Sequence, residues 1–102
     1  MYTTDQYKSK VRTFGALGYD AERIADLLNL HGEERIELIV RLSVSGDELR
    51  IAYENGLAVG EYNIDVGLTK LAEQGDIDAI EALGERSKQR KTRDMKKHLF
   101  GV

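Results

Sequence analysis

The chain has 102 residues, 32% of them charged, and contains neither cysteine nor proline. A chain of this length forms one domain or two small lobes, and without cysteine it holds no disulfide or thiolate metal site. No apolar run approaches the roughly 18 residues of a membrane-spanning helix, and the first residues lack the apolar core of a signal peptide. The sequence therefore favours a cytoplasmic protein without a membrane partner.

The net charge of −3 hides a strong segregation along the chain. Residues 1–19 carry a net charge of +2, residues 20–85 a net −11 and residues 86–98 a net +6. An acidic body between two basic ends predicts that an anionic partner binds at the ends.

Residues 1–45 are predicted to form a three-helix unit of helix-turn-helix type. Apolar residues recur with a helical period over residues 5–16, 21–28 and 33–42, and Asp20 stands where the second helix needs an N-cap. Acidic residues occupy the start of the third helix, where a DNA-reading helix would present its N-terminal residues: Glu33, Glu34 and Glu37. Three carboxylates there would repel phosphates, so this unit is expected to be structural rather than base-reading.

Residues 46–85 are predicted to form an antiparallel helical hairpin. Its first helix runs from Glu48 to Gln74, and Asp76 caps the second helix after a tight turn at Gly75. Residues 86–102 form a basic C-terminal helix or tail. The expected fold class is all-α, with a short helix-turn-helix-like bundle followed by a long hairpin.

Small residues form one stripe on the first hairpin helix, at spacings of four, three and four: Gly56, Gly60, Asn63 and Gly67. Each glycine in a helix interior costs about 1 kcal/mol relative to alanine. The stripe marks either a kinked or frayed helix or the close approach of another helix, from this chain or from a second copy. We favour close approach and assign these four residues to an oligomer interface.

The sequence shows no catalytic constellation. His31 lies in a turn and His98 near the C-terminus, with no cysteine or activated serine beside them. The acidic residues at the start of the last helix, Asp76 and Asp78 with Glu81, fit a cap and a solvated first turn better than a metal site. We therefore expect no enzyme activity, metal or cofactor.

The basic C-terminal segment is the strongest candidate for a binding surface. If the last helix continues past Leu83, residues 86, 90, 93 and 97 share a strip about 60° wide, which can follow a phosphate backbone or an acidic protein surface. The alternative is a solvated helix end in which Arg90 pairs with Asp94. Together with the N-terminal cations, the candidate DNA-binding residues are Lys8, Lys10, Arg12, Arg86, Lys88, Arg90, Lys91, Arg93 and Lys97. The apolar side chains of Met95, Leu99 and Phe100 on the same segment indicate a docking point.

Two stretches together resemble a known family. "YDAERIADLLNL" resembles the first half of a homeodomain-like helix-turn-helix, and "AYENGLAVGEYNIDVGLTKLAEQGDIDAIEALGERSKQRK" is similar to the tail of phage small DNA-binding proteins, including small terminase subunits. The matching positions of the second stretch are Tyr53, Gly56, Ala58, Glu61, Ile64, Leu68, Leu71, Ala72, Gly75, Asp76 and Ala79. The resemblance implies a viral protein of the host cytoplasm that binds double-stranded DNA for genome packaging, forms a homo-oligomer and hands DNA to a large terminase subunit.

Two other functions stay open. One is a helical protein-interaction module, such as a phage regulator or inhibitor with an acidic docking surface. The other is a transcriptional regulator with a degenerate helix-turn-helix.

Overall fold

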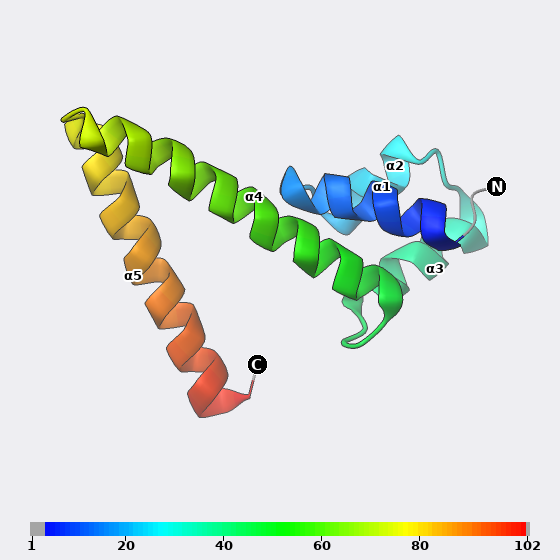
Figure 1. Cartoon of the computed structure of the whole chain (residues 1–102). Helices are drawn as coiled ribbons and strands as arrows, with labels where there is room; N and C mark the ends of the chain where they lie inside the picture. The colour runs from blue at the N-terminus through cyan, green and yellow to red at the C-terminus, as the bar shows by residue number, and fades with distance from the viewer. Residues whose placement is uncertain (1–3, 102) are drawn as a thin grey trace. The chain divides into compact units, whose positions relative to one another are not determined.

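The structure, a computed structural model, describes residues 4–101, without the side chains of Thr4 and Phe100. Five α-helices and no strands make up this part of the chain, as the sequence predicts (Figure 1). They are α1 (Thr4–Ala16), α2 (Ala21–Leu27), α3 (Gly32–Ser43), α4 (Glu48–Glu73) and α5 (Ile77–Phe100). The all-α fold class is thus confirmed.

The chain divides into two compact units, Met1–Tyr62 and Asn63–Val102. The division falls inside α4, whereas the sequence predicts boundaries near residues 45 and 85. The first unit holds α1, α2, α3 and the beginning of α4, and the second holds the end of α4 and α5.

The first unit has the hydrophobic core. Val11 of α1 and Ile24 of α2 are fully buried, and α3 and α4 add Leu38, Leu42 and Leu49. Polar contacts fix the helix ends around this core. The Asp20 carboxylate accepts a hydrogen bond from the Arg23 amide at 2.8 Å, as expected of an N-cap. Asp47 accepts from the Leu49 amide at 2.8 Å at the start of α4.

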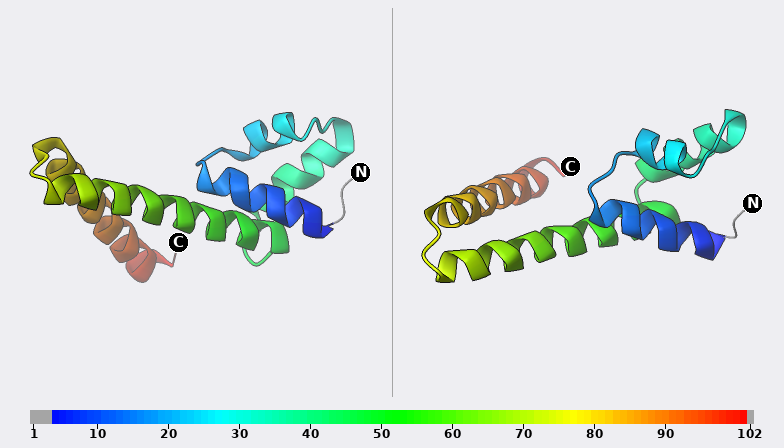
Figure 2. Two further views of the ribbon diagram at one scale, coloured as in Figure 1. Left: turned by 45° about the horizontal axis from the view of Figure 1, so that its top comes forward. Right: turned by 90° about the horizontal axis from the view of Figure 1, so that it is seen from above.

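The glycine stripe of α4 lies partly against α1, which runs beside the beginning of α4 in both views of Figure 2. A Cβ atom on Gly56 would meet the backbone carbonyl of Arg12, and one on Gly60 would meet that of Ala16. The close approach that the sequence predicts is therefore made by a helix of the same chain at these two positions. Since α1 covers them, Gly56 and Gly60 do not lie at an interface between copies, which corrects that part of the assignment.

The other members of the stripe have different surroundings. Asn63 is exposed, and a Cβ on Gly67 would meet nothing within 4 Å. Their assignment to an interface between copies stays a prediction.

The second unit is a helical hairpin with very little core. Gly75 takes a φ of 89° in the turn, and the Asp76 carboxylate caps α5 by accepting from the Ala79 amide at 2.9 Å. Ala79, at 3% exposure, is the one buried side chain that the described residues 63–101 contribute. The basic C-terminal segment belongs to this hairpin as a continuous helix, because α5 runs to Phe100.

Replacing the packed glycines is expected to destabilise the fold. Gly56→Ala and Gly60→Ala should each lower the free energy of unfolding by about 1–3 kcal/mol, because α1 must move to admit the methyl group. Gly67→Ala is the matched control. Its methyl group meets no neighbour within 4 Å, so it should raise the free energy of unfolding by up to about 1 kcal/mol. Urea denaturation followed by circular dichroism measures both effects, and equal stabilities of the three variants would contradict close packing of α1 on α4.

Candidate functional site

Two arginines of the predicted DNA-binding strip bind one carboxylate of the same chain. The Arg86 Nε donates to Asp65 Oδ1 and the Arg90 Nη2 to Asp65 Oδ2, both at 2.6 Å. The Asp65 side chain is 26% exposed and those of Arg86 and Arg90 are 28% and 43% exposed. We call this pair of bonds the Asp65 clamp; it ties α5 to the end of α4.

The clamp corrects the assignment of Arg86 and Arg90 to a DNA-binding surface. At about 100° per residue, the strip formed by residues 86 and 90 continues the side of α5 that carries the buried Ala79. This side faces α4, so the strip begins on the inner face of the hairpin. Sequence reasoning did not single out Asp65, although its position ten residues before Gly75 places it opposite the residues that follow position 84 in an antiparallel hairpin.

The clamp lowers the pKa of Asp65. The hydrogen bond from Arg86 is the main cause, and the charges of Arg86 and Arg90 add to it, while partial desolvation opposes them. Because the folded carboxyl group releases its proton more readily than the unfolded one, the clamp stabilises the fold above the ordinary pKa of about 3.9. This contribution is lost as the pH falls through the lowered pKa of the folded state.

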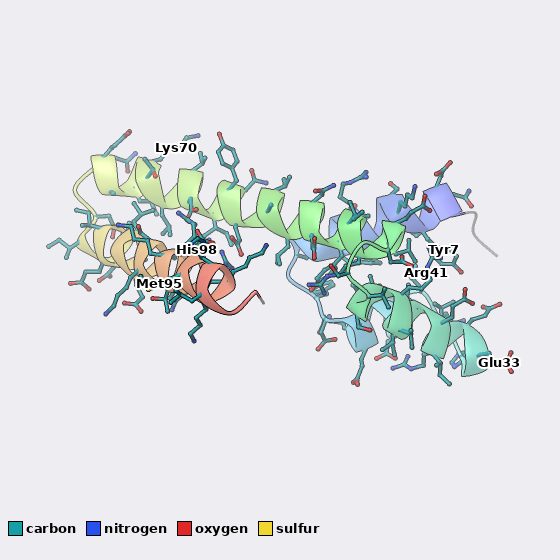
Figure 3. The ribbon with its side chains drawn as sticks, turned by 90° about the horizontal axis from the view of Figure 1, so that it is seen from below. Tyr7, Glu33, Arg41, Lys70, Met95 and His98 are labelled. Carbon is teal, nitrogen blue, oxygen red and sulfur yellow. The ribbon has the colours of Figure 1, made fainter. Side chains whose placement is uncertain are left out.

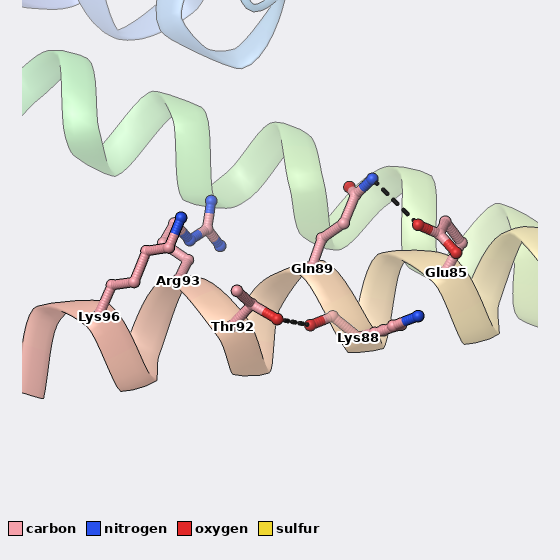
Figure 4. Close-up of a pocket in the computed structure, with 6 residues that line it drawn as sticks. All are labelled: Glu85, Lys88, Gln89, Thr92, Arg93 and Lys96. Carbon is pink, nitrogen blue, oxygen red and sulfur yellow. Dashed lines mark hydrogen bonds between the residues drawn. The ribbon is translucent and has the colours of Figure 1, made fainter.

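Four lysines of α5 after Glu85 remain exposed: Lys88, Lys91, Lys96 and Lys97. Among the described residues of the second unit, no carboxylate lies within ion-pairing distance of any of them. Arg93, also exposed, lies on the same segment. A hollow of about 500 Å³ lies at this segment. Figure 4 draws the residues that line it: Glu85, Lys88, Gln89, Thr92, Arg93 and Lys96. All six belong to α5, so the hollow suits an extended partner along the helix rather than an enclosed small ligand.

The N-terminal cations are less available than the sequence predicts. The Lys8 ammonium group lies 3.6 Å from a Glu48 carboxylate oxygen and 3.9 Å from one of Asp5. Lys10 is half-buried, and Arg12 is exposed although its backbone packs against Gly56. The structure therefore does not join these cations into one free basic surface.

The third helix presents acidic and apolar side chains. Glu33 and Glu37 are exposed, and Figure 3 shows Glu33 at the first turn of α3. The apolar side chains of Ile36 and Val40, on the same helix, are 63% and 52% exposed. Arg35, on the same helix, binds the Asp26 carboxylate of α2.

The apolar residues of the C-terminal segment are also open to solvent. Met95, labelled on α5 in Figure 3, is 62% exposed and Leu99 is 64% exposed. The side chain of Phe100, the third member of the predicted docking point, lies outside the described residues.

Other classes of site have no counterpart in the described residues. Among residues 4–101 no three histidine or acidic side chains come together as metal ligands would. None of the described helices is both long and apolar enough to span a membrane. No family model, curated protein or solved structure matches the chain.

The Asp65 clamp predicts an ordered response of the Asp65 pKa to substitution. Arg86→Gln should raise this pKa toward its ordinary value, and Arg90→Gln should raise it by less, because the hydrogen bond from Arg86 has the larger effect. Lys88→Gln, on the same helix without contact to Asp65, is the control and should leave the pKa nearly unchanged. Carbon-13 NMR titration of the side-chain carboxyl group measures the three values. A pKa that none of the substitutions moves would contradict the clamp.

Proposed function

We propose that the chain is a non-enzymatic, small-terminase-like phage protein that binds double-stranded DNA during genome packaging in the host cytoplasm. In this role it acts as an oligomer and has the large terminase subunit as its protein partner. The observation that supports DNA binding is a set of exposed lysines on α5 after Glu85, which make no ion pair with the described carboxylates of the second unit: Lys88, Lys91, Lys96 and Lys97.

These lysines suit contact with the phosphate backbone. Residues 88–97 span about 14 Å of helix, and duplex DNA presents one negative charge per roughly 1.7 Å of its axis. Phosphate contacts hold a protein on DNA but carry no direct sequence information. We therefore propose that α5 supplies affinity and salt dependence, and that it does not read bases.

A second candidate function is a protein-interaction module, and the surface of α3 favours it. Exposed Ile36 and Val40 offer apolar area, while Glu33 and Glu37 beside them would repel DNA. A partner with an apolar and basic face would suit this surface. The two candidates are compatible if α5 binds DNA and α3 binds a protein of the packaging machinery.

Substitution of the terminal lysines tests the proposal. Lys96→Gln with Lys97→Gln should weaken duplex binding and flatten the plot of log affinity against log salt by about 0.9 for each phosphate that the variant no longer neutralises. The control, Arg23→Gln with Lys70→Gln, removes the same charge from positions outside α5 and should leave the slope nearly unchanged. Fluorescence anisotropy with a labelled duplex at several salt concentrations measures both.

Two outcomes would count against DNA binding by α5. If the intact protein binds no duplex at low salt, the packaging role is removed and the interaction module is left. If the control flattens the slope as much as the lysine variant does, the lysines of α5 affect DNA binding only through the net charge of the protein and not through specific contacts with phosphates.

A further inference from the structure

The hairpin unit leaves much of its apolar surface without a packing partner. Besides Ala79, no side chain of the described residues 63–101 is buried. Large apolar side chains on both of its helices are about half exposed or more: Ile64, Leu71, Ile77, Ile80, Met95 and Leu99. Helices in water derive most of their stability from packing an apolar face. The hairpin therefore has apolar surface that neither of its own two helices covers.

Part of this surface forms one continuous face of α5. At about 100° per residue, six residues lie within an arc of about 80°: Ile77, Ile80, Gly84, Lys88, Lys91 and Met95. We call this the outer face of α5. It lies roughly opposite Arg86 and Arg90, which bind Asp65 of α4. A Cβ on Gly84, at its middle, would meet nothing within 4 Å, so another backbone has room to approach there.

The charges of α5 identify the kind of partner. From Asp76 to Glu85 the segment has four acids and no base, whereas residues 86–97 have seven bases and one acid. DNA would be repelled by the first half, and a uniformly acidic protein likewise. A second copy of the same helix, running antiparallel, places each acidic half against the basic half of the other copy.

We propose that the outer face of α5 binds the outer face of a second copy across a two-fold axis. Antiparallel alignment of Gly84 with Lys88 of the second copy also brings Ile77 opposite Met95 and Glu81 opposite Lys91. Glu85 then lies within reach of Lys88 of the other copy, because an offset of one residue is only about 1.5 Å along the helix. Such an interface uses the same patch on both copies and closes at two subunits.

Pairing of two copies also reduces the number of lysines that can contact DNA. Lys88 and Lys91 face the carboxylates of the second copy in the pair. Lys96 and Lys97 project from other sides of α5, so they stay available to phosphates at both ends of the paired helices. Pairing itself requires no DNA.

Charge reversal tests the pairing, because two variants with opposite reversals should pair with each other although neither pairs with itself. One variant is Glu81→Lys with Glu85→Lys, and the other is Lys88→Glu with Lys91→Glu. Each variant alone brings like charges together and should weaken self-association at least tenfold. Their equimolar mixture restores opposite charges at every contact and should form a heterodimer. Analytical ultracentrifugation of the full chain without DNA, from about 10 to 500 µM, measures all three samples, and circular dichroism checks that each variant is helical.

A glycine pair provides a second measurement that does not depend on charge. Gly84→Leu should weaken self-association, because its side chain obstructs the second copy. Gly67→Leu, at the other open helical glycine, should leave it unchanged.

The outcomes separate this inference from the proposed function. A monomer at every concentration, an assembly larger than two, or a mixture that stays monomeric would each overturn the two-fold pairing. DNA binding by a monomer would leave the proposed function standing without the pairing. A dimer restored in the mixture but unable to bind DNA would support the pairing and remove the proposed function.

Discussion

The arrangement of charge on α5 depends on one carboxylate shared by two arginines. Asp65 accepts from Arg86 and Arg90, so the first cations of the basic segment bind α4 instead of facing solvent. Each bond is charge-assisted, and together they fix which side of α5 faces inward. Because that side is fixed, Lys88 and Lys91 lie on the opposite side with Ile77 and Met95. The side of α5 that faces α4 thus determines which residues of α5 are left for the proposed contacts with a second copy.

Local signals in the sequence predict the helices well. Asp20 and Asp76 cap the helices for which the sequence assigns them. The helical period predicts the bounds of the first four helices to within a few residues and the beginning of the fifth, whereas it leaves open whether residues 86–102 continue the fifth helix. Which helix packs against which is harder to predict from the sequence, because helix packing depends on segments that are distant along the chain. The spacing of Gly56 and Gly60 indicates that another helix approaches, but the identity of α1 follows only from the core that four helices build together.

The candidate site is less predictable than the fold for a related reason. A helical strip of four cations is visible in the sequence, yet its first half faces inward. The decisive signals are small Ala79, which is buried on the inner side of α5, and the position of Gly75 in the turn, which aligns Asp65 with Arg86. Neither signal is evident until the two hairpin helices are aligned residue by residue. Cation spacing alone therefore cannot separate an internal ion pair from a free surface.

The scarcity of buried side chains in the hairpin also affects its dynamics. Segments with few buried apolar contacts open at lower free energy than a well-packed core, and they do so without unfolding the rest of the protein. Core residues such as Val11 and Ile24 belong to the other unit. Amide hydrogens of α5 should consequently exchange with solvent deuterium well before those around these core residues. An unassembled copy would then expose α5 to proteases, so that assembly would also govern how long the chain survives.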